Sequence, residues 1–397
     1  MPEQAIKELI NVISLSRFLF HLICRHPEML GQFCSPTGKT SVNQTVSCID
    51  DLRIYKYHEL LRLTRIDMQN LPDYGQVLAD LSYLAEFVFN KTVELSLSPS
   101  NREVFERYFC TYGLGKLGAS ELNYSSDIDL VFLCANPADV PMAVHEYQQI
   151  LQDGIRLTSS QLEHRTIDGF LYRVDLKLRP WGSSGPLVMS IDETENYYAA
   201  STETWERFAW LRARIISGNR TLGNDLLSRL QPFIYKRSLS SDDLDRFVEI
   251  KNEMYRVRRK KGHWNVKLGE GGIRDIEFFV QMLQMVNAAT HPALKVTGTM
   301  NVLAELRKYG LIPEPEEQDV HECYMFLRKL ENHLQMIDEH QTHELPDDPR
   351  LKTIIARSLN ISGQSDAEIL DTFETRLFNC RTIARGFFER ILPQQHT

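Results

Sequence analysis

TYGLGKLGASELNYSSDIDLVFL, residues 111–133, is the most informative stretch of this sequence. Glycines divide its first half, and a short apolar run follows Asp127, a pattern typical of strands joined by turns and short helices. We therefore read it as a strand, a glycine turn, a short helix and a second strand. The stretch predicts an α/β segment, which extends over residues 101–235.

The glycine turn matches GxGxxG, but its context excludes a dinucleotide-binding fold. Such a fold has a helix and another strand before its acidic residue, about 20 positions on. Here Asp127 and Asp129 follow within a few residues and begin a strand instead. Lys116 is followed by Leu117, not by Ser or Thr, so the turn is not a phosphate-binding P-loop either.

The aspartates at the start of the second strand predict a different site. The period of two places Asp127 and Asp129 on one face of the strand and Ile128 on the other. Two adjacent carboxylates repel each other, and a divalent cation such as Mg²⁺ or Mn²⁺ would relieve that repulsion. Taken alone, the pair fits two solvated surface acids better than a metal site.

A second alternating segment, Tyr172–Arg179, changes that balance. Its polar face carries one carboxylate, Asp175, among the cations Arg173, Lys177 and Arg179. Acids for metals and cations for phosphate oxygens are what a nucleotide or phosphodiester site requires. The alternative is an exposed strand whose charged residues form salt bridges with one another. The presence of Asp127 and Asp129 nearby favours the nucleotide site over this alternative.

Other segments carry weaker signals. GEGGIRDIE, residues 269–277, opens a helix whose polar face carries Arg274 and Glu277; its glycines suit either an anion or simple packing. The segment from Trp205 to Arg212 reads mainly as core packing. His340 and His343 lack further ligands at zinc spacing. No Ser/His/Asp or Cys/His set is evident, so nucleophilic catalysis by the protein is not indicated.

Bulk properties limit the classes of function. The formal net charge of −8 argues against general binding to nucleic acid, and no apolar run approaches the roughly 20 residues of a membrane span. The seven cysteines lack CxxC pairs, and the N-terminus does not read as a signal peptide, so we expect a cytoplasmic protein. The basic run 256–261 reads mainly as a solvated helix end.

Helical periodicity dominates on both sides of the α/β segment. We expect an N-terminal helical region over 1–100, with Leu78, Leu81 and Val88 in one helix, and a helical bundle over 236–397. With the segment 101–235 between them, the predicted fold class is α+β.

The sequence resembles the glutamine synthetase adenylyltransferase/adenylyl-removing enzyme family, within the polymerase-β-like nucleotidyltransferase superfamily. The resemblance is carried by GLGKLGASELNYSSDIDLVFL, FLYRVDLKLRPWGSSGPLVMS, WERFAWLRARII, KLGEGGIRDIEFFVQ and LRKLENHLQMIDEHQTHELP. It includes the N-terminal LSRFLFHLICRHPEML and LSYLAE, so it covers nearly the whole chain. It implies a polymerase-β-like nucleotidyltransferase sheet flanked by the two helical regions. The family has two related halves, and Arg274 in GGIRDIEF resembles the adenylyl-removing half. One departure is Ala119, where the family pattern GKLGG has Gly.

The resemblance implies phosphorolysis of tyrosyl-AMP on glutamine synthetase, which releases ADP. It implies that Asp127, Asp129 and Asp175 are catalytic and hold Mg²⁺ or Mn²⁺. The expected nucleotide- and phosphate-binding residues are Gly115, Lys116, Gly118, Ser125, Ser126, Arg173, Arg179, Arg274 and Glu277. Expected partners are glutamine synthetase, the PII signal protein, ADP or ATP, and phosphate. The alternatives are ATP-dependent adenylylation of the same target, or a catalytically silent half that only binds.

Overall fold

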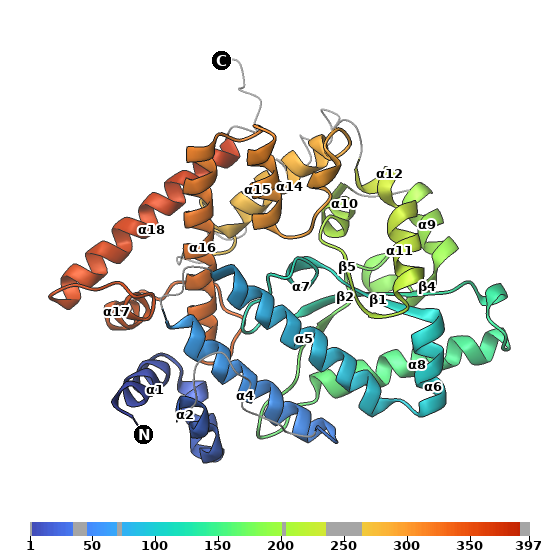
Figure 1. Ribbon diagram of the computed structural model, residues 1–397, viewed down its shortest axis with the longest axis horizontal. Helices are drawn as coiled ribbons and strands as arrows, with labels where there is room; N and C mark the ends of the chain where they lie inside the picture. The colour runs from blue at the N-terminus through green and yellow to red at the C-terminus, as the bar shows by residue number, and fades with distance from the viewer. Residues whose placement is uncertain (1, 35–45, 70–73, 201–203, 236–263, 390–397) are drawn as a thin grey trace.

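The computed structural model describes residues 2–34, 46–69, 74–200, 204–235 and 264–389. Helices form the N-terminal part: α1 (Glu3–Leu15), α2 (Arg17–Arg25), η1 (Pro27–Leu30), α3 (Gly31–Cys34), α4 (Ile49–Asp67), α5 (Tyr74–Ser96) and α6 (Pro99–Tyr108). The long helices α4 and α5 pack side by side (Figure 1). The predicted apolar stripe of α5 is confirmed, because Leu78, Leu81 and Val88 are all buried.

A five-stranded mixed sheet follows. Its strands are β1 (Phe109–Gly113), β2 (Ile128–Cys134), β3 (Val174–Asp175), β4 (Val188–Ser190) and β5 (Arg214–Gly218). β1 pairs antiparallel with β2 and with β5. β3 and β4 both pair in parallel with β2, at its beginning and its end respectively. The predicted order of strand, glycine turn, short helix and strand is confirmed as β1, α7 (Gly115–Gly118) and β2.

Helices between and after these strands cover both faces of the sheet. They are η2 (Pro137–Asp139), α8 (Val144–Glu163), η3 (Gly182–Ser184), α9 (Ile191–Ala200), α10 (Thr204–Trp210), α11 (Arg220–Arg229) and α12 (Gln231–Ile234). Ile128, Leu130 and Phe132 of β2 share one core with α4, α5 and α8. Val131 and Leu133 point into a second core, under α9, α10 and α11. Both faces of β2 are therefore buried.

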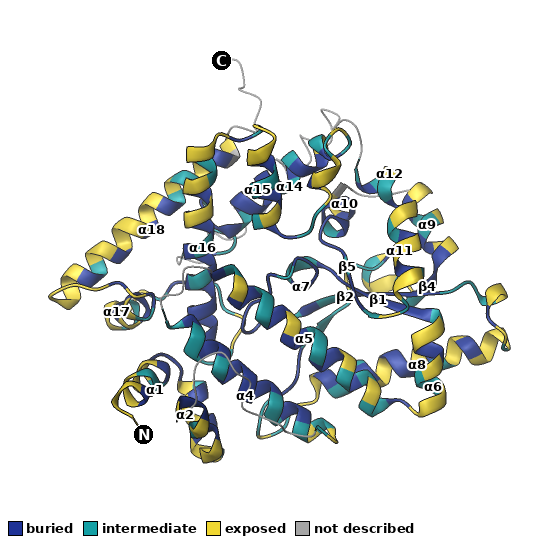
Figure 2. Cartoon of the chain, viewed as in Figure 1, coloured by how far each residue is buried: buried dark blue, intermediate teal, exposed yellow. Residues whose placement is uncertain are grey.

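The C-terminal part is helical: α14 (Ile273–Asn287), η5 (Pro292–Leu294), α15 (Thr299–Lys308), α16 (Glu314–Met336), α17 (Pro349–Ser358) and α18 (Asp366–Glu389). It contacts the N-terminal helices directly, since α1 packs against α17 and the Ser16 hydroxyl donates to the Met336 carbonyl at 2.5 Å. Buried residues continue along α16 into the centre of the molecule (Figure 2). The three regions therefore pack on one another.

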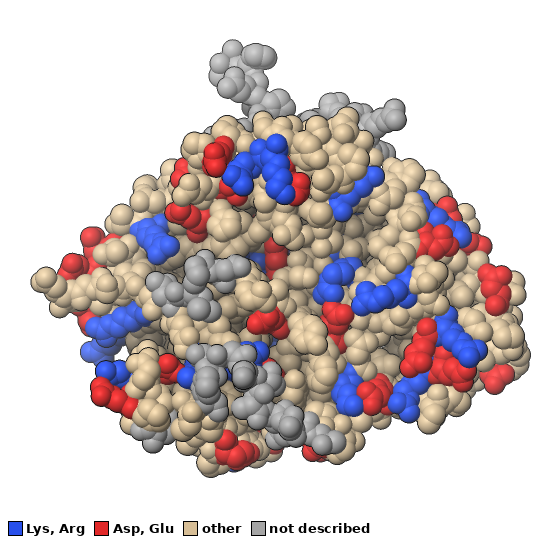
Figure 3. All heavy atoms as spheres, in the orientation of Figure 1, with Lys and Arg blue, Asp and Glu red and all other residues tan. Residues whose placement is uncertain are grey.

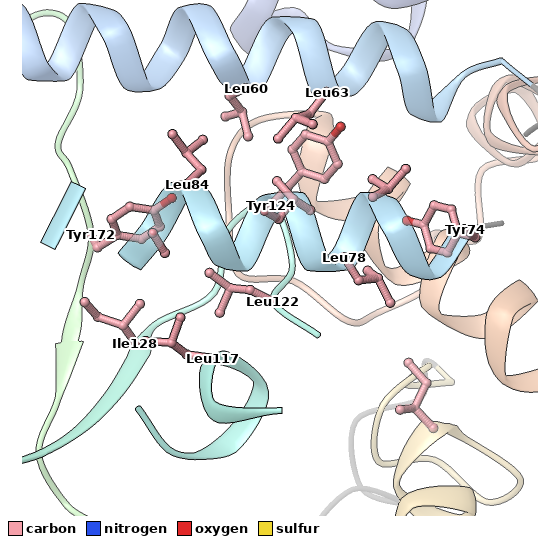
Figure 4. Packing of buried hydrophobic residues seen from close by; sticks show 14 of the residues in the cluster. Leu60, Leu63, Tyr74, Leu78, Leu84, Leu117, Leu122, Tyr124, Ile128 and Tyr172 are labelled. Atoms are coloured by element: carbon pink, nitrogen blue, oxygen red, sulfur yellow. The ribbon is translucent and has the colours of Figure 1, made fainter. Parts of the chain in front are cut away.

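The main core forms where α4, α5 and the glycine turn meet (Figure 4). Leu60 and Leu63 of α4 face Leu84 of α5, whereas Leu78 points from the other side of α5. Leu117 of α7 packs into the same cluster and is almost fully buried. Burial of each such side chain contributes about 1.5–3 kcal/mol. This core fixes the glycine turn relative to the helices around it.

The predicted α+β class is confirmed, but the second predicted strand is wrong in extent. β3 ends at Asp175, and residues 176–187 leave the sheet before β4 begins. Pro180 lacks a backbone N–H for a ladder, and Gly182 has a left-handed φ of 57°, so the chain turns here. The domain limits 1–100, 101–235 and 236–397 stay predictions, and the basic run 256–261 lies outside the described residues.

The cysteines, the helices and the surface charge can be compared with the expectations from composition. All seven cysteines are free thiols, and no described helix has the length and apolar character of a membrane span. On the face shown in Figure 3, acidic and basic side chains are interspersed without a broad basic field.

Candidate active site

Asp129 and Asp175 lie next to each other on neighbouring strands. The parallel ladder of β2 and β3 pairs Asp129 directly with Asp175, which places both side chains on the same side of the sheet. Burial, and next the charge of Asp175, raise the pKa of Asp129 to about 6, well above the usual value for Asp. Like charges are thus held together on the sheet surface.

The glycine turn closes tightly over Asp129. A Cβ atom at Gly115 would lie 2.3 Å from Oδ2 of Asp129, and the φ of Gly115 is left-handed at 53°. The Leu114 amide also donates to the Asp129 carbonyl at 2.9 Å. Only glycine suits this position, because any side chain would displace the carboxylate.

The other two aspartates carry ion pairs with cations of their own chain. Asp127 lies just before β2 and accepts a short hydrogen bond from Nε of Arg173. Asp175 accepts from the Lys177 amide at 2.8 Å and from Lys177 Nζ at 2.9 Å. Within the described part of the chain, Asp129 forms no ion pair of this kind. The three carboxylates therefore differ, and Asp129 is the one whose charge is compensated least.

A cavity of about 300 Å³ opens beside Asp129 and Gly115. Its wall combines cations and aromatic rings: Arg212, Lys267, Arg274, Trp205, Phe208 and Phe278, with Leu178, Ala209 and Gln281. Cations suit phosphate oxygens, and flat rings suit a nucleobase. The cavity therefore has the composition of a nucleotide site.

Lys116, a predicted phosphate contact, points away from that cavity into a buried ion cluster. Its Nζ lies 2.7 Å from Oε2 of Glu331 on α16, and Nδ1 of His343 lies 2.8 Å from Oε1 of the same carboxylate. Burial lowers the pKa of Lys116 to about 7, although Glu331 opposes this shift. Lys116 thus ties the glycine turn to the C-terminal helices.

Arg274 and Glu277 lie on α14, at the boundary between the cavity and the buried cluster. Arg274 lines the cavity, with Nη1 3.7 Å from Glu277. Glu277 is buried and accepts from Arg212 at 3.2 Å and from the Tyr324 hydroxyl at 3.3 Å. Burial alone would raise the pKa of Glu277, but the surrounding cations, Arg212 first, lower it to about 2.

The remaining predicted contacts have partners within the chain. Ser125 donates from its hydroxyl to the Glu339 carbonyl at 2.8 Å, and Ser126 is partly exposed beside it. A Cβ atom at Gly118 would lie 1.9 Å from the Arg212 carbonyl, so this glycine permits close packing. Arg179 donates to four backbone carbonyls of its own loop, those of Leu176, Ser183, Gly185 and Pro186. The structure therefore brings Gly115, Asp129, Asp175 and Arg274 together, and holds the others nearby.

The paired glycines before α14 serve packing within the chain. The Gly271 amide donates to Asp275 Oδ2 at 2.9 Å, and the Gly272 amide donates to the Gly269 carbonyl at 2.9 Å. A Cβ atom at Gly271 would lie 2.3 Å from the Arg381 carbonyl on α18. Of the two readings that the sequence left open, the structure favours packing over an anion site.

Several functional candidates escaped the sequence interpretation. Trp205, Phe208 and Arg212 were assigned mainly to core packing, yet all three line the cavity. Lys267 begins the segment KLGEGGIRDIEFFVQ, which carries the family resemblance, but no role was predicted for it. Arg212 directly follows the apolar run 208–211 and is buried. A charged residue in such a place was the available signal, because a buried arginine requires partners and marks a polar site.

The carboxylates at the start of β2 and at the end of β3 are the candidate ligands for the predicted metal. Within the described residues, no three His, Cys, Asp or Glu side chains are arranged as a group that could hold a metal. Asp129 and Asp175 nevertheless fit a divalent cation, because they are paired like charges and the pKa of Asp129 is raised. Asp127 would join them only if Arg173 released it.

A mixed sheet that carries carboxylates on neighbouring strands, next to a glycine turn and a basic cavity, defines a nucleotidyltransferase. Residues 6–229 match the family described as Glutamate-ammonia ligase adenylyltransferase, and residues 246–392 match one described as GlnD PII-uridylyltransferase. The first match covers more than half of the sequence, so the chain belongs to the glutamate-ammonia ligase adenylyltransferase family.

Similar curated proteins carry the description bifunctional glutamine synthetase adenylyltransferase/adenylyl-removing enzyme. The protein of Thioalkalivibrio sulfidiphilus is 36% identical over 389 residues, which cover 91% of this chain and 40% of the relative. That of Stenotrophomonas maltophilia (strain K279a) is 34% identical over 391 residues, covering 93% of this chain and 41% of the relative. The chain thus spans about two fifths of the length of these relatives. The family resemblance seen in the sequence is confirmed.

Proposed function

We propose that this chain removes adenylyl groups from a tyrosine of glutamine synthetase by phosphorolysis. The observation that carries the proposal is the Asp129 and Asp175 pair at the edge of a cavity with three cations. The names of the similar proteins include both adenylylation and its removal. Arg274, whose presence in GGIRDIEF is the sequence feature that favours removal, lines that cavity.

In this reaction an oxygen of inorganic phosphate attacks the phosphorus of tyrosyl-O-AMP. The bond from phosphorus to the tyrosine oxygen breaks, the tyrosine takes a proton, and ADP leaves. Asp129 and Asp175 would hold Mg²⁺ or Mn²⁺, and Asp127 would join them once Arg173 releases it. When bound, the metal would supply positive charge for the entering and leaving oxygens. No covalent intermediate with the protein is required.

The chain's own residues would bind and orient the substrates. Arg212, Lys267 and Arg274 suit the phosphate groups, since guanidinium and ammonium donors pair with phosphate oxygens. The rings of Trp205 and Phe278 suit the adenine base. Gly115 leaves the backbone of the turn accessible to the nucleotide, because it carries no side chain.

A two-arm assay tests the proposal. The chain is incubated with adenylylated glutamine synthetase, phosphate and Mg²⁺, and in parallel with unmodified glutamine synthetase, ATP and Mg²⁺. We expect ADP in the first arm and no pyrophosphate in the second. If only pyrophosphate is formed, the chain adenylylates glutamine synthetase and the proposed direction is wrong. If neither product is formed, a role in binding alone remains. The Asp129→Asn variant controls for contaminating activity.

The expected cytoplasmic location and the PII signal protein as a partner belong to the same proposal. Both come from the sequence and its family resemblance. Co-purification of the chain with PII, with and without ATP, tests the partner directly. For this test PII is attached to a resin. If equal amounts of the chain are recovered from resin with and without PII, PII is not a partner.

A further inference from the structure

A second and larger cavity lies on the other side of the loop 176–187. Its volume is about 780 Å³, and α8, α9 and the edge strand β4 surround it. Leu178 and Trp205 line the smaller cavity, whereas Trp181 and Glu206 line the larger one. The loop and α10 therefore form a shared wall, so that the two cavities adjoin each other.

Trp181, which lines this second cavity, is exposed and has an unusual backbone conformation. Its side chain is 57% exposed, and its φ of 58° is left-handed, a conformation that is rare for bulky residues. The indole packs edge to face on Tyr197, with ring centroids 4.6 Å apart. Backbone strain of this kind persists only where the surrounding structure imposes it, and it gathers at binding sites.

The loop that carries Trp181 is held in one shape. The guanidinium of Arg179 donates to the carbonyls of Leu176, Ser183 and Gly185 at 2.7 to 3.1 Å. A Cβ atom at Gly185 would lie 2.0 Å from the Pro180 carbonyl, so the turn is also closely packed. An ordered loop loses little conformational entropy on binding, which favours its use as a recognition surface.

The chemistry of the second cavity is opposite to that of the first. Its polar lining consists of carboxylates, amides and hydroxyls: Glu193, Glu206, Gln148, Gln152, Asn196 and Ser190. None of the described residues that line it is Lys or Arg, whereas the smaller cavity contains three such residues. Aromatic rings beside carboxylates attract cations through both charge and the face of the ring. Glu206 is buried and accepts from the Tyr197 hydroxyl at 2.7 Å, so the exposed carboxylate of the lining is Glu193. With the aromatic rings beside it, this carboxylate favours a cationic ligand.

We infer that this cavity is a docking site for a Lys- or Arg-bearing segment of the protein substrate, with Trp181 as its aromatic anchor. The inference rests on the proposed function for the identity of the substrate, but not for the binding itself. A segment docked here would lie directly across the shared wall from Asp129 and the smaller cavity. The wall would then position the modified tyrosine, while the cavity with the cations receives its AMP group.

Steady-state kinetics test the docking role. Trp181→Ala should raise the KM for adenylylated glutamine synthetase at least tenfold and change kcat less than twofold. Phosphorolysis of free tyrosyl-AMP, which lacks the docking segment, should be unchanged. Glu193→Gln keeps an oxygen for the Ser190 amide but loses the charge, so it should raise the same KM about threefold. An unchanged KM in both variants, or an equal loss with free tyrosyl-AMP, would overturn the inference.

Direct binding separates this inference from the proposed function. A short lysine-rich peptide is titrated into the chain, and tryptophan fluorescence is followed; an acidic peptide of equal length and spermidine serve as comparisons. We expect the lysine peptide alone to give a saturable change, which Trp181→Phe abolishes. Equal binding of spermidine would indicate a small-molecule site and overturn a peptide site. Because no turnover is required, the peptide result holds even if no ADP is formed.

Discussion

Two groups of carboxylates in this molecule behave in opposite ways. On the sheet, the pKa of Asp129 is raised because Asp129 is partly buried beside Asp175. Behind the glycine turn, Glu331 is fully buried, yet Lys116, His343 and Arg328 surround it and its pKa is well below the ordinary value. Burial opposes ionisation in both places. The partners decide the outcome, so paired charges indicate a structural role and crowded like charges indicate a functional one.

The largest effect should come from Asp129→Asn. We expect transfer activity to fall at least a thousandfold, equivalent to roughly 4 kcal/mol, because a neutral amide is a poor ligand for a hard cation. The melting temperature of the variant in chelator should equal or exceed that of wild type. With millimolar Mg²⁺, wild type should gain stability and the variant much less.

Thermal melts in both conditions, together with the ADP assay, check this prediction. Full activity of wild type in chelator would remove the metal from the mechanism. A variant that melts well below wild type in chelator would show that the carboxylate stabilises the fold instead.

Arg328→Leu should be the most destabilising change in the buried cluster. The guanidinium is fully buried, donates to the Tyr324 hydroxyl and to Asn123 Oδ1, and lies beside Glu331. Removal of one partner leaves buried charge uncompensated, at a cost of about 3–5 kcal/mol. Urea unfolding measures the loss. A loss below about 1 kcal/mol would contradict the structural role assigned to this cluster.

The pH dependence of stability sharpens the comparison for Asp129. Its folded-state pKa is about 6, whereas that of an unfolded Asp is about 3.9. Between these values the folded state binds more protons, so stability in chelator should fall as pH rises from 4 to 6, by roughly 1–3 kcal/mol. Asp129→Asn should lack this decrease. Urea unfolding of both proteins at pH 4.5 and pH 7 tests the sign of this change in stability. If the stability of wild type alone rises between these pH values, Asp129 and Asp175 do not repel each other as described.

The smallest effect should come from Arg229→Leu, the matched control for Arg328. Arg229 pairs with Asp192, Glu195 and Asp225 at 2.9 Å, but on the surface. Each exposed pair contributes about 0–1 kcal/mol, because water and salt screen its charges. If urea unfolding gives this variant a loss equal to that of Arg328→Leu, burial is not what distinguishes the two groups.

Sequence reasoning succeeded where the signal is local. Alternation and glycine punctuation predicted β1, α7 and β2 and placed the aspartates of β2 at a strand start. The same alternation predicted a strand as far as Arg179, but β3 ends at Asp175. Pro180, Gly182 and Gly185 favour a turn there, which alternation alone does not reveal. Neither strand alone predicts that Asp129 pairs with Asp175; that expectation requires both strands to carry acids of the same site.

The buried cluster was not predictable from one sequence. Lys116 and Glu331 lie 215 positions apart, and neither belongs to a local pattern that names the other. Glu121 lies in the polar segment between α7 and β2, and it accepts from the Thr299 amide at 2.6 Å and from the Tyr324 hydroxyl at 3.0 Å. Such partners are set by how the helices pack, which a periodicity of 2 or 3.6 does not encode.

β3 and β4 follow one another along the same edge of β2, and the Trp181 loop is an excursion between them. The registers of β3 and of β4 are fixed by their pairing with β2 and not by the loop between them. The loop is therefore a replaceable module: its length and sequence can change while Asp129 and Asp175 stay in register. Evolution, or an engineer, could in this way alter which protein the enzyme recognises without rebuilding the chemistry it performs.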